Sequence, residues 1–455
     1  MDRVLALGLS AGLLIITAVE GGWLLPPLAL SVLGFVGLYW WRGMAPAQLV
    51  AMLGRGARQS FGVLSILLLI GGLTAAWMAA GTVATLVYYG LQLIQPRLFI
   101  LSAFVLTGAV SILIGTSFGT VGTIGLALMI MARGGGVSPP WVAGAIIAGA
   151  YVGDRCSPLS SSAYLVATLT ETNLYANLRV MATTAMVPWL LSAGIYLVAS
   201  WQHPLVVGDQ GFWTDIPTAF SLHWVTLLPA VLIFGLVALR VPVKLTLLLS
   251  LGLASGIAIG WQGYSPRQLG SFLIFGFELG SSTELADILR GGGIWPMAKV
   301  GLLVMVSTAL AGLLAETETL SALQNWLKTL RPGRPLLVGT LATSLASAAY
   351  GCTQTMAILL TYQLTQPSYR QAHLSAQRQA IDLENTAVVL SPLIPWNIAG
   401  LIPATLLMVN AEFIPFAVYL YLLPLWELGC RPQRLRLLSP ATQANQPDLV
   451  RPAKP

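Results

Sequence analysis

Uncharged or nearly uncharged apolar runs recur along almost the whole chain. They cover residues 4–19, 22–41, 61–80, 98–114, 180–202, 222–239, 245–260, 300–315, 335–349, 386–411 and 413–426. A helix needs about 20 apolar residues to cross the hydrocarbon core of a bilayer, so the pattern predicts about 10 to 13 passes, some of them broken. The runs lack the roughly ten-residue apolar/polar alternation of a membrane β-barrel. The sequence therefore predicts an all-α polytopic membrane protein.

Composition agrees with this pattern. Of the 455 residues, 56% are hydrophobic and only 9% are charged, against about 25% charged in an average soluble domain. Residues 1–20 place Arg3 ahead of an apolar stretch, as a signal peptide does, but Ala18-Val19-Glu20 is a poor cleavage site and further apolar runs follow at once. We expect a first transmembrane helix there, within a single membrane domain over residues 1–430.

The net charge of +7 is distributed as a topology signal and does not indicate nucleic-acid binding. Basic residues gather in the loops at 42–58, 328–334 and 431–436, whereas residues 203–221 hold Asp209 and Asp215 without a Lys or Arg. The positive-inside rule places the basic loops and the N-terminus in the cytoplasm and residues 203–221 outside. The polar, Pro-rich segment 431–455 is predicted to be a disordered cytoplasmic tail.

Cysteine and histidine give no sign of a disulfide or a metal centre. The three residues of each type are scattered through the chain without the spacing of such sites. Residues 134–136 (Gly-Gly-Gly) lead into no P-loop lysine, so we expect neither ATP-driven transport by this chain nor a cofactor.

One polar pattern occurs in both halves of the chain. Residues 115–120 (Gly-Thr-Ser-Phe-Gly-Thr) and residues 351–355 (Gly-Cys-Thr-Gln-Thr) each interrupt an apolar region, and each is followed by Ser-Pro-Leu with a carboxylate shortly before it, Asp154 or Glu384. Interrupted helices in corresponding positions of two halves mark the binding site of a secondary transporter. We therefore predict two inverted repeats, at about residues 60–202 and 295–428, with broken or re-entrant helices. The alternative is chance similarity among the small residues that membrane helices favour.

Asp154 stands in the middle of an otherwise apolar stretch, residues 139–170. An ionised Asp at the centre of a membrane helix costs about 2.5–3.5 kcal/mol, so it indicates a functional site with a partner or a water-filled cavity. Pro158 disfavours helix at Ser157 and frees backbone carbonyls nearby. Such oxygens suit sodium, and a carboxylate that also takes a proton lets the two ions exclude one another. The alternative places Asp154 and Arg155 at a helix end near the membrane interface.

A second function fits part of the same stretch. Gly115, Ser117 and Gly119 match the G-x-S-x-G pattern of serine hydrolases. That nucleophile elbow needs a strand before it and a helix after it, and no histidine stands as an obvious base inside an apolar run. We therefore expect a transporter and not an enzyme. Small residues here could also serve only helix packing.

Three groups of residues resemble motifs of the NhaC family of sodium/proton antiporters. Residues 115–123 and 149–160 are similar to its G-T-S-x-G-T and G-A-Y-x-G-D-x-x-S-P-L-S signatures, and residues 383–385 with 391–397 give the second match; residues 290–297 give a weaker third. The resemblance implies about a dozen transmembrane helices in the bacterial inner membrane, inverted repeats and alternating access. It also implies exchange of cytoplasmic sodium for external protons.

Three positions depart from the family pattern. Ser161 and Thr353 stand where the family usually has acidic residues, and its acidic pair after Leu383 is reduced to Glu384-Asn385. Fewer acids imply fewer bound cations per cycle, or a substrate that is not a bare cation. Since some relatives exchange organic acids, the alternative function is a sodium- or proton-coupled carrier or exchanger of a small organic solute, a carboxylate or an amino acid. Arg155 is a candidate partner for a carboxylate.

The predicted site combines residues from both halves. Asp154 is the expected sodium ligand; the other ion- or substrate-binding candidates are Thr116, Ser117, Thr120, Ser157, Ser161, Thr353, Gln354, Glu384 and Asn397. Glu384 could instead lie at a solvated rim, and Asn397 could form a helix–helix hydrogen bond. The expected partners are sodium, protons or a small organic solute, membrane lipid, and a second copy of the chain.

Overall fold

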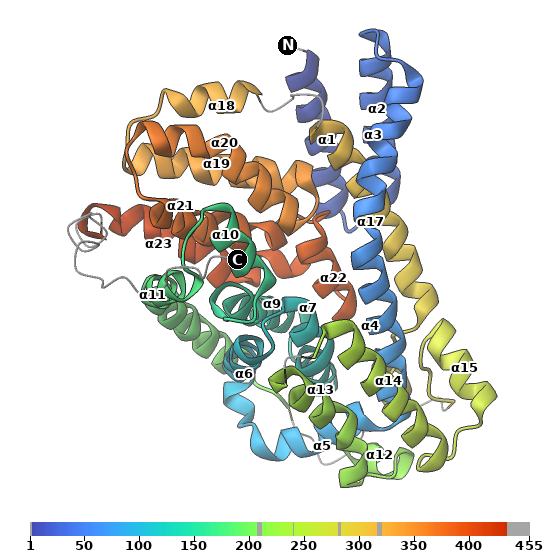
Figure 1. The fold of residues 1–455 in the computed structure, drawn as a ribbon. Coiled ribbons are helices and arrows are strands. Elements are labelled where there is room, and N and C mark those ends of the chain that lie inside the picture. The colour runs from blue at the N-terminus through green and yellow to red at the C-terminus, as the bar shows by residue number, and fades with distance from the viewer. Residues whose placement is uncertain (1, 207–211, 240, 281–283, 316–320, 435–455) are drawn as a thin grey trace, which may run out of the picture.

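The computed structural model describes residues 2–206, 212–239, 241–280, 284–315 and 321–434. This part of the chain folds into helices joined by short turns (Figure 1). No β-strand forms within it, and one isolated antiparallel bridge joins Phe277 to Gly291. The predicted all-α fold is confirmed.

Within the described residues, six helical stretches are long and apolar enough to cross a membrane. They are α4 (Phe61–Ala79), η1 with α6 (Pro96–Leu98 and Phe99–Ile114), α7 with η2 and α8 (Ser117–Thr120, Val121–Gly125 and Leu126–Gly134), α11 (Leu174–Gln202), α14 (Val243–Gly260) and α17 (Ile294–Ala315). A seventh span is possible where α21, η4 and η5 (Ala376–Leu383, Glu384–Val388 and Ser391–Leu393) meet α22 (Ile398–Leu406) at a bend of 51°. The chain is therefore a multi-pass membrane protein, and the larger count of 10 to 13 passes stays a prediction.

Shorter, bent or more polar helices complete the described residues. They are α1 (Asp2–Val19), α2 (Leu25–Trp41), α3 (Pro46–Gln59), α5 (Thr82–Leu93), α9 (Pro139–Cys156), α10 (Ser161–Leu169), α12 (Phe212–Ala219), η3 (Trp224–Leu227), α13 (Leu228–Ala238), α15 (Pro266–Phe275), α16 (Glu284–Ile288), α18 (Ser321–Lys328), α19 (Arg334–Gly351), α20 (Gln354–Gln371), η6 (Ala411–Phe416) and α23 (Val418–Arg434). Helix α23 extends through residues 431–434 of the predicted tail, and residues 435–455 lie outside the described residues.

Figure 1 shows where several segments of the topology prediction lie. The turn between α2 and α3, which begins at Arg42, and helix α18, which ends at Lys328, lie toward the top of Figure 1, whereas α12 lies at the bottom. Helices α4 and α17 run side by side between the two ends. The turn at Arg42 and α12 therefore lie at opposite ends of the fold, and the assignment of these ends to the cytoplasm and the outside stays a prediction.

Helix α9 lies at the centre of the fold because small residues let it approach α6 closely. A Cβ atom added to Gly149 would lie 2.1 Å from the Thr107 Oγ1, and one added to Gly153 would lie 2.0 Å from the Ser111 carbonyl carbon. Small residues at such crossings allow backbones in a membrane to pack tightly. Residues 142–155 of α9 are all buried as a result.

The two polar interruptions have the same backbone geometry. Gly115 ends α6 in the left-handed region (φ +75°), and the extended Thr116 begins α7 and accepts a hydrogen bond from the Gly119 N–H. Cys352 ends α19 in the same region (φ +54°), and the extended Thr353 begins α20 and accepts from the Met356 N–H. Each interruption is therefore a left-handed residue followed by a threonine N-cap.

Candidate functional site

The Asp154 carboxylate lies where the two interruptions meet. Its side chain, on the last turn of α9, is only 4% exposed. Its Oδ2 accepts a hydrogen bond of 2.8 Å from the Nε2 of Gln354, the first residue of α20. The backbone N–H of Ser117, the first residue of α7, also reaches the carboxylate. One buried acid therefore receives a donor from each half of the chain.

The backbone carbonyl of Asp154 is already occupied. It accepts a hydrogen bond from the Ser160 hydroxyl and another, of 2.7 Å, from the Ser162 hydroxyl. The break before Pro158 does free this carbonyl from the helix, as the sequence predicts, but two serines of the following turn satisfy it. Oxygen ligands for a cation at this site would therefore come from side chains.

Arg155 is fully buried and is directed toward α11 and η4. Its guanidinium donates to the Thr184 Oγ1 at 2.9 Å, to the Met181 carbonyl at 3.2 Å and to the Asn385 Oδ1. The sequence analysis considered Arg155 as a partner for a carboxylate, and in the structure these hydrogen bonds already occupy its guanidinium. Asp154 and Arg155 are both buried within the protein.

Glu384 is buried, not solvated. It is 1% exposed and begins η4, a single π-helical turn; such turns are rare and occur frequently at functional sites. Its Oε2 has no hydrogen-bond partner among the described residues. Arg155 attracts this carboxylate and Asp154 repels it, so the three charges form one electrostatic group.

Three of the predicted residues form hydrogen bonds within or beside their own breaks. Thr116 and Thr353 are the two N-caps, and the Thr120 Oγ1 donates to the Thr116 carbonyl at 2.9 Å. A hydroxyl used in this way shapes the backbone that presents the carboxylate.

Two further candidates join helices, and one is exposed. The Ser157 Oγ donates to the Ile112 carbonyl at 2.7 Å, and the Asn397 Nδ2 donates to the Ala348 carbonyl at 2.7 Å while its Oδ1 caps α22. The helix–helix role considered for Asn397 is therefore what the geometry shows. Ser161 is exposed at the start of α10, in contrast to its buried neighbours Ser160 and Ser162.

Tyr151 is part of the site but was absent from the predicted set. It is fully buried, and its hydroxyl donates to the Ala399 carbonyl at 2.8 Å, which ties α9 to α22. It also lies beside Asp154 and the Ser117 side chain. The sequence did contain one sign of this role: Tyr151 precedes Asp154 by three residues, a spacing that places both side chains on one face of a helix.

A second buried cluster of charges lies outside the predicted set. Arg378 pairs with Asp382 at 2.8 Å and with Glu427 at 2.9 Å, and the Tyr369 hydroxyl donates to Asp382 at 2.6 Å. These side chains are at most 5% exposed and join α20, α21 and α23. In sequence they resemble a solvated face, because Glu427 is far from Arg378 along the chain.

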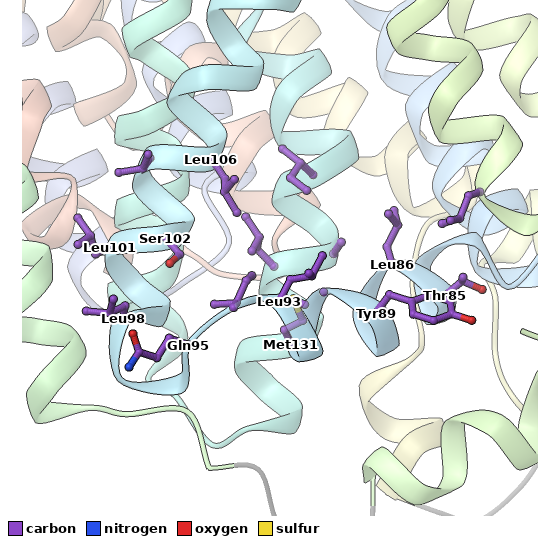
Figure 2. Close-up of a pocket in the computed structure, with 17 residues that line it drawn as sticks. Thr85, Leu86, Tyr89, Leu93, Gln95, Leu98, Leu101, Ser102, Leu106 and Met131 are labelled. Atoms are coloured by element: carbon purple, nitrogen blue, oxygen red, sulfur yellow. The ribbon is translucent and has the colours of Figure 1, made fainter. Parts of the chain in front are cut away.

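A cavity of about 780 Å³ between α5, α6 and α8 does not contribute to this site (Figure 2). Leucine, isoleucine and methionine side chains such as Leu86, Leu106 and Met131 dominate its lining, with a few polar groups such as Gln95 and Ser102. Such a lining suits hydrocarbon and offers no carboxylate to an ion. None of the predicted site residues lines it.

Comparison with known proteins gives the family. The sequence model of the Na⁺/H⁺ antiporter family matches residues 2–201 and 149–429. The chain belongs to this family. The Na⁺/H⁺ antiporter NhaC of Alkalihalophilus pseudofirmus is 30% identical over 79% of this chain and 79% of its own length. The resemblance to the NhaC family is thereby confirmed.

Other relatives of this chain have names that state different transported solutes. The malate-2H⁺/Na⁺-lactate antiporter of Bacillus subtilis is 29% identical over 77% of this chain and 76% of its own length. The arginine/ornithine antiporter ArcD of Halobacterium salinarum is 27% identical over 84% and 81%. Sodium and protons are the ions that the family description supports.

Proposed function

We propose that this protein exchanges sodium for protons across the bacterial inner membrane by alternating access, with the two ions competing for the Asp154 carboxylate. One observation supports this most strongly: a buried acid accepts a hydrogen bond from Gln354, the first residue of the helix after one break, and lies beside the N–H of Ser117, the first residue of the helix after the other. Half-helix N-termini directed at an anionic group near the meeting point of two repeats are a recurring design in secondary transporters.

The hydrogen bonds explain how both ions can use one acid. The amide of Gln354 and the N–H of Ser117 stabilise the ionised carboxylate. The Ser162 hydroxyl also lies beside the carboxylate. A carboxylate has about four lone-pair sites, so three donors leave one for a cation. A proton on Asp154 removes the negative charge that holds sodium. Binding of one ion therefore opposes binding of the other, which couples their movements.

Charge counting supports one monovalent cation per cycle. Asp154, Glu384 and Arg155 together carry a net charge of −1 when all three are ionised, and they lie in a buried region where net charge is unfavourable. One sodium or one proton brings the group to neutrality. The neutral residue Thr353, which caps the helix that begins at Gln354, agrees with this low number of bound cations.

The repeated backbone geometry supports the alternating-access part of the proposal. Both breaks use a left-handed residue and a threonine cap, and the 51° bend between η5 and α22 supplies a second interruption after the repeated Ser-Pro-Leu. Inverted topology of the two repeats, residues about 60–202 and 295–428, would let one half rock against the other around Asp154.

The alternative, exchange of a small organic solute, is supported by the names of two relatives. Arg155 is the residue nearest to Asp154 in sequence that could bind a substrate carboxylate, yet its guanidinium already donates to Thr184, Met181 and Asn385. The Asp154 site is therefore better suited to a cation than to an organic anion.

The test is sodium-driven proton flux into proteoliposomes that contain the purified protein. Asp154→Asn should abolish the flux while the protein remains folded by size-exclusion chromatography, because the amide can neither release a proton nor neutralise sodium. Glu412→Gln, which removes an exposed carboxylate on η6, is the matched control and should keep the flux. Full flux in Asp154→Asn would contradict the proposed site. No response of the wild type to sodium, lithium or potassium would contradict cation antiport and favour an organic solute.

A further inference from the structure

A second cavity, of about 420 Å³, lies apart from the Asp154 site. It is enclosed by α4, by the chain around residues 275–278 and 290–297, and by the end of α22, and none of the predicted site residues lines it. Thr74 is on the half of α4 that lies away from α18 (Figure 1). Under the predicted topology, the cavity therefore belongs to the external half of the protein.

Three consecutive glycines shape one wall of this cavity, and the first two of them line it. Gly291, Gly292 and Gly293 have φ values of +143°, +70° and +92°, which other residues rarely adopt. The Gly293 N–H donates to the Gly71 carbonyl at 2.7 Å, and a Cβ on Gly292 would lie 2.5 Å from the Ala75 nitrogen. The wall is thus held directly against α4, which gives residues 290–297 a structural role.

The bridge between Phe277 and Gly291 orients two charged residues of the lining. It consists of two hydrogen bonds, of 2.9 and 3.1 Å. In an antiparallel pair the next residues along each chain, here Glu278 and Arg290, stand opposite one another on one face. Both are exposed, both line the cavity, and no ion pair joins them within the described residues.

Arg290 and an unsatisfied hydroxyl line the cavity together with Glu278, and the nearby Arg133 brings the net charge of the three ionised groups to +1. Arg290 lies close enough to Arg133 for the two guanidinium groups to repel each other. Arg133 itself donates to the Met408 carbonyl at 2.7 Å, so it fixes the end of α22 beside the cavity. Thr74, which is 3% exposed, lines the cavity, and its Oγ1 has no hydrogen-bond partner in the described part of the chain. A buried hydroxyl without a partner is unfavourable, and an acceptor in the cavity would relieve it.

We propose that this cavity binds a small organic carboxylate from the external side. The carboxylate accepts hydrogen bonds from the Arg290 guanidinium and the Thr74 hydroxyl, and its aliphatic part contacts the apolar lining. That lining consists of Phe275, Phe277, Pro296, Met297, Leu406 and Met408. Arginine suits this role because its planar donors match the geometry of a carboxylate. The proposal goes beyond cation exchange and does not require Asp154 to be the coupling residue.

Binding of potassium L-lactate to the purified full chain, measured by isothermal titration calorimetry against potassium chloride at equal ionic strength, tests this proposal. Arg290→Gln should weaken binding about tenfold or more, because a charged hydrogen bond is lost. Thr74→Val keeps the shape of the side chain and should weaken binding less. Arg267→Gln, which removes an exposed positive charge from neighbouring α15 but not from the cavity, should bind as the wild type does.

Asp154→Asn separates this site from the coupling site. It should bind lactate normally even though it loses sodium-driven proton flux. Absence of lactate binding to the wild type, or equal affinities of the wild type and Arg290→Gln, would overturn the proposal. Loss of binding in Asp154→Asn with retention in Arg290→Gln would also overturn it, because the ligand would then occupy the central site.

Discussion

Replacing Gln354 by methionine removes the side-chain donor from the Asp154 carboxylate and keeps a side chain of similar length. The bond from the Gln354 Nε2 to the carboxylate measures 2.8 Å and is charge-assisted. The same Nε2 also donates to the Val388 carbonyl, but at a longer distance of 3.3 Å. Hydrogen bonds to charged groups contribute about 1.5–3 kcal/mol. Since Gln354 is half-buried, we take the lower end, about 1.5 kcal/mol, which corresponds to about 1 pH unit.

The sign follows from which form of Asp154 the bond stabilises. Gln354 donates to the ionised carboxylate, so its removal favours the protonated form. The acidic limb of the pH profile of sodium-driven proton flux should therefore move to higher pH by about 1 unit. Below that limb the apparent KM for sodium should rise, because the proton is harder to displace.

The assay is proton flux in proteoliposomes over a range of pH values and sodium concentrations. Gln379→Met is the matched control: its buried amide donates to the Thr365 Oγ1 at 3.2 Å, away from the carboxylate. That variant should keep the wild-type pH profile even if it loses some stability. An unchanged profile in Gln354→Met, or the same shift in both variants, would refute the reasoning.

Three further predictions concern the breaks and their surroundings. Gly115→Ala should lower the free energy of unfolding by about 1–3 kcal/mol, because its φ is +75° and its new Cβ would lie 2.6 Å from the carbonyl carbon of Leu159, between α9 and α10. Gly136→Ala, also at positive φ but with open space around it, should cost less, and equal thermal-unfolding midpoints of the two variants would contradict this. Arg155→Met should destabilise the folded protein by about 3–5 kcal/mol, since it leaves buried carboxylates without their counter-charge, and an unchanged melting temperature in detergent would count against it. Thr353→Asp keeps an N-cap and adds a carboxylate beside the site, so it should lower the apparent KM for sodium in the flux assay. Ser161→Asp, at an exposed position, should leave this KM unchanged. A lower KM in Ser161→Asp but not in Thr353→Asp would show that the exposed position is the one that binds sodium.

Local pattern was enough to predict several elements of this fold. The uncharged runs at residues 61–80, 98–114 and 245–260 coincide closely with α4, α6 and α14, because length and apolarity are properties of a single helix. The interruption at Gly115 could likewise be predicted, since glycine followed by threonine is typical of a helix end and a new cap.

Contacts between distant segments could not be read from the sequence. Nothing in the pattern around Gln354 shows that its amide reaches Asp154, because hydropathy does not specify which helices pack together. The same holds for Arg378 and Glu427, whose charges resemble a solvated rim until their pairing in the folded chain removes them from water. Ser161 differs for a local reason: at the start of a helix, adjacent side chains point in different directions, so a candidate one position away from a buried residue can be exposed.

The two helix breaks are built from backbone geometry and threonine caps, with no acidic side chain in their construction. During evolution, acids around them can therefore be gained or lost without dismantling the architecture that presents Asp154. Proteins with this backbone can therefore change the transported solute through a few side-chain substitutions at the site. The different solutes in the names of the relatives agree with this expectation.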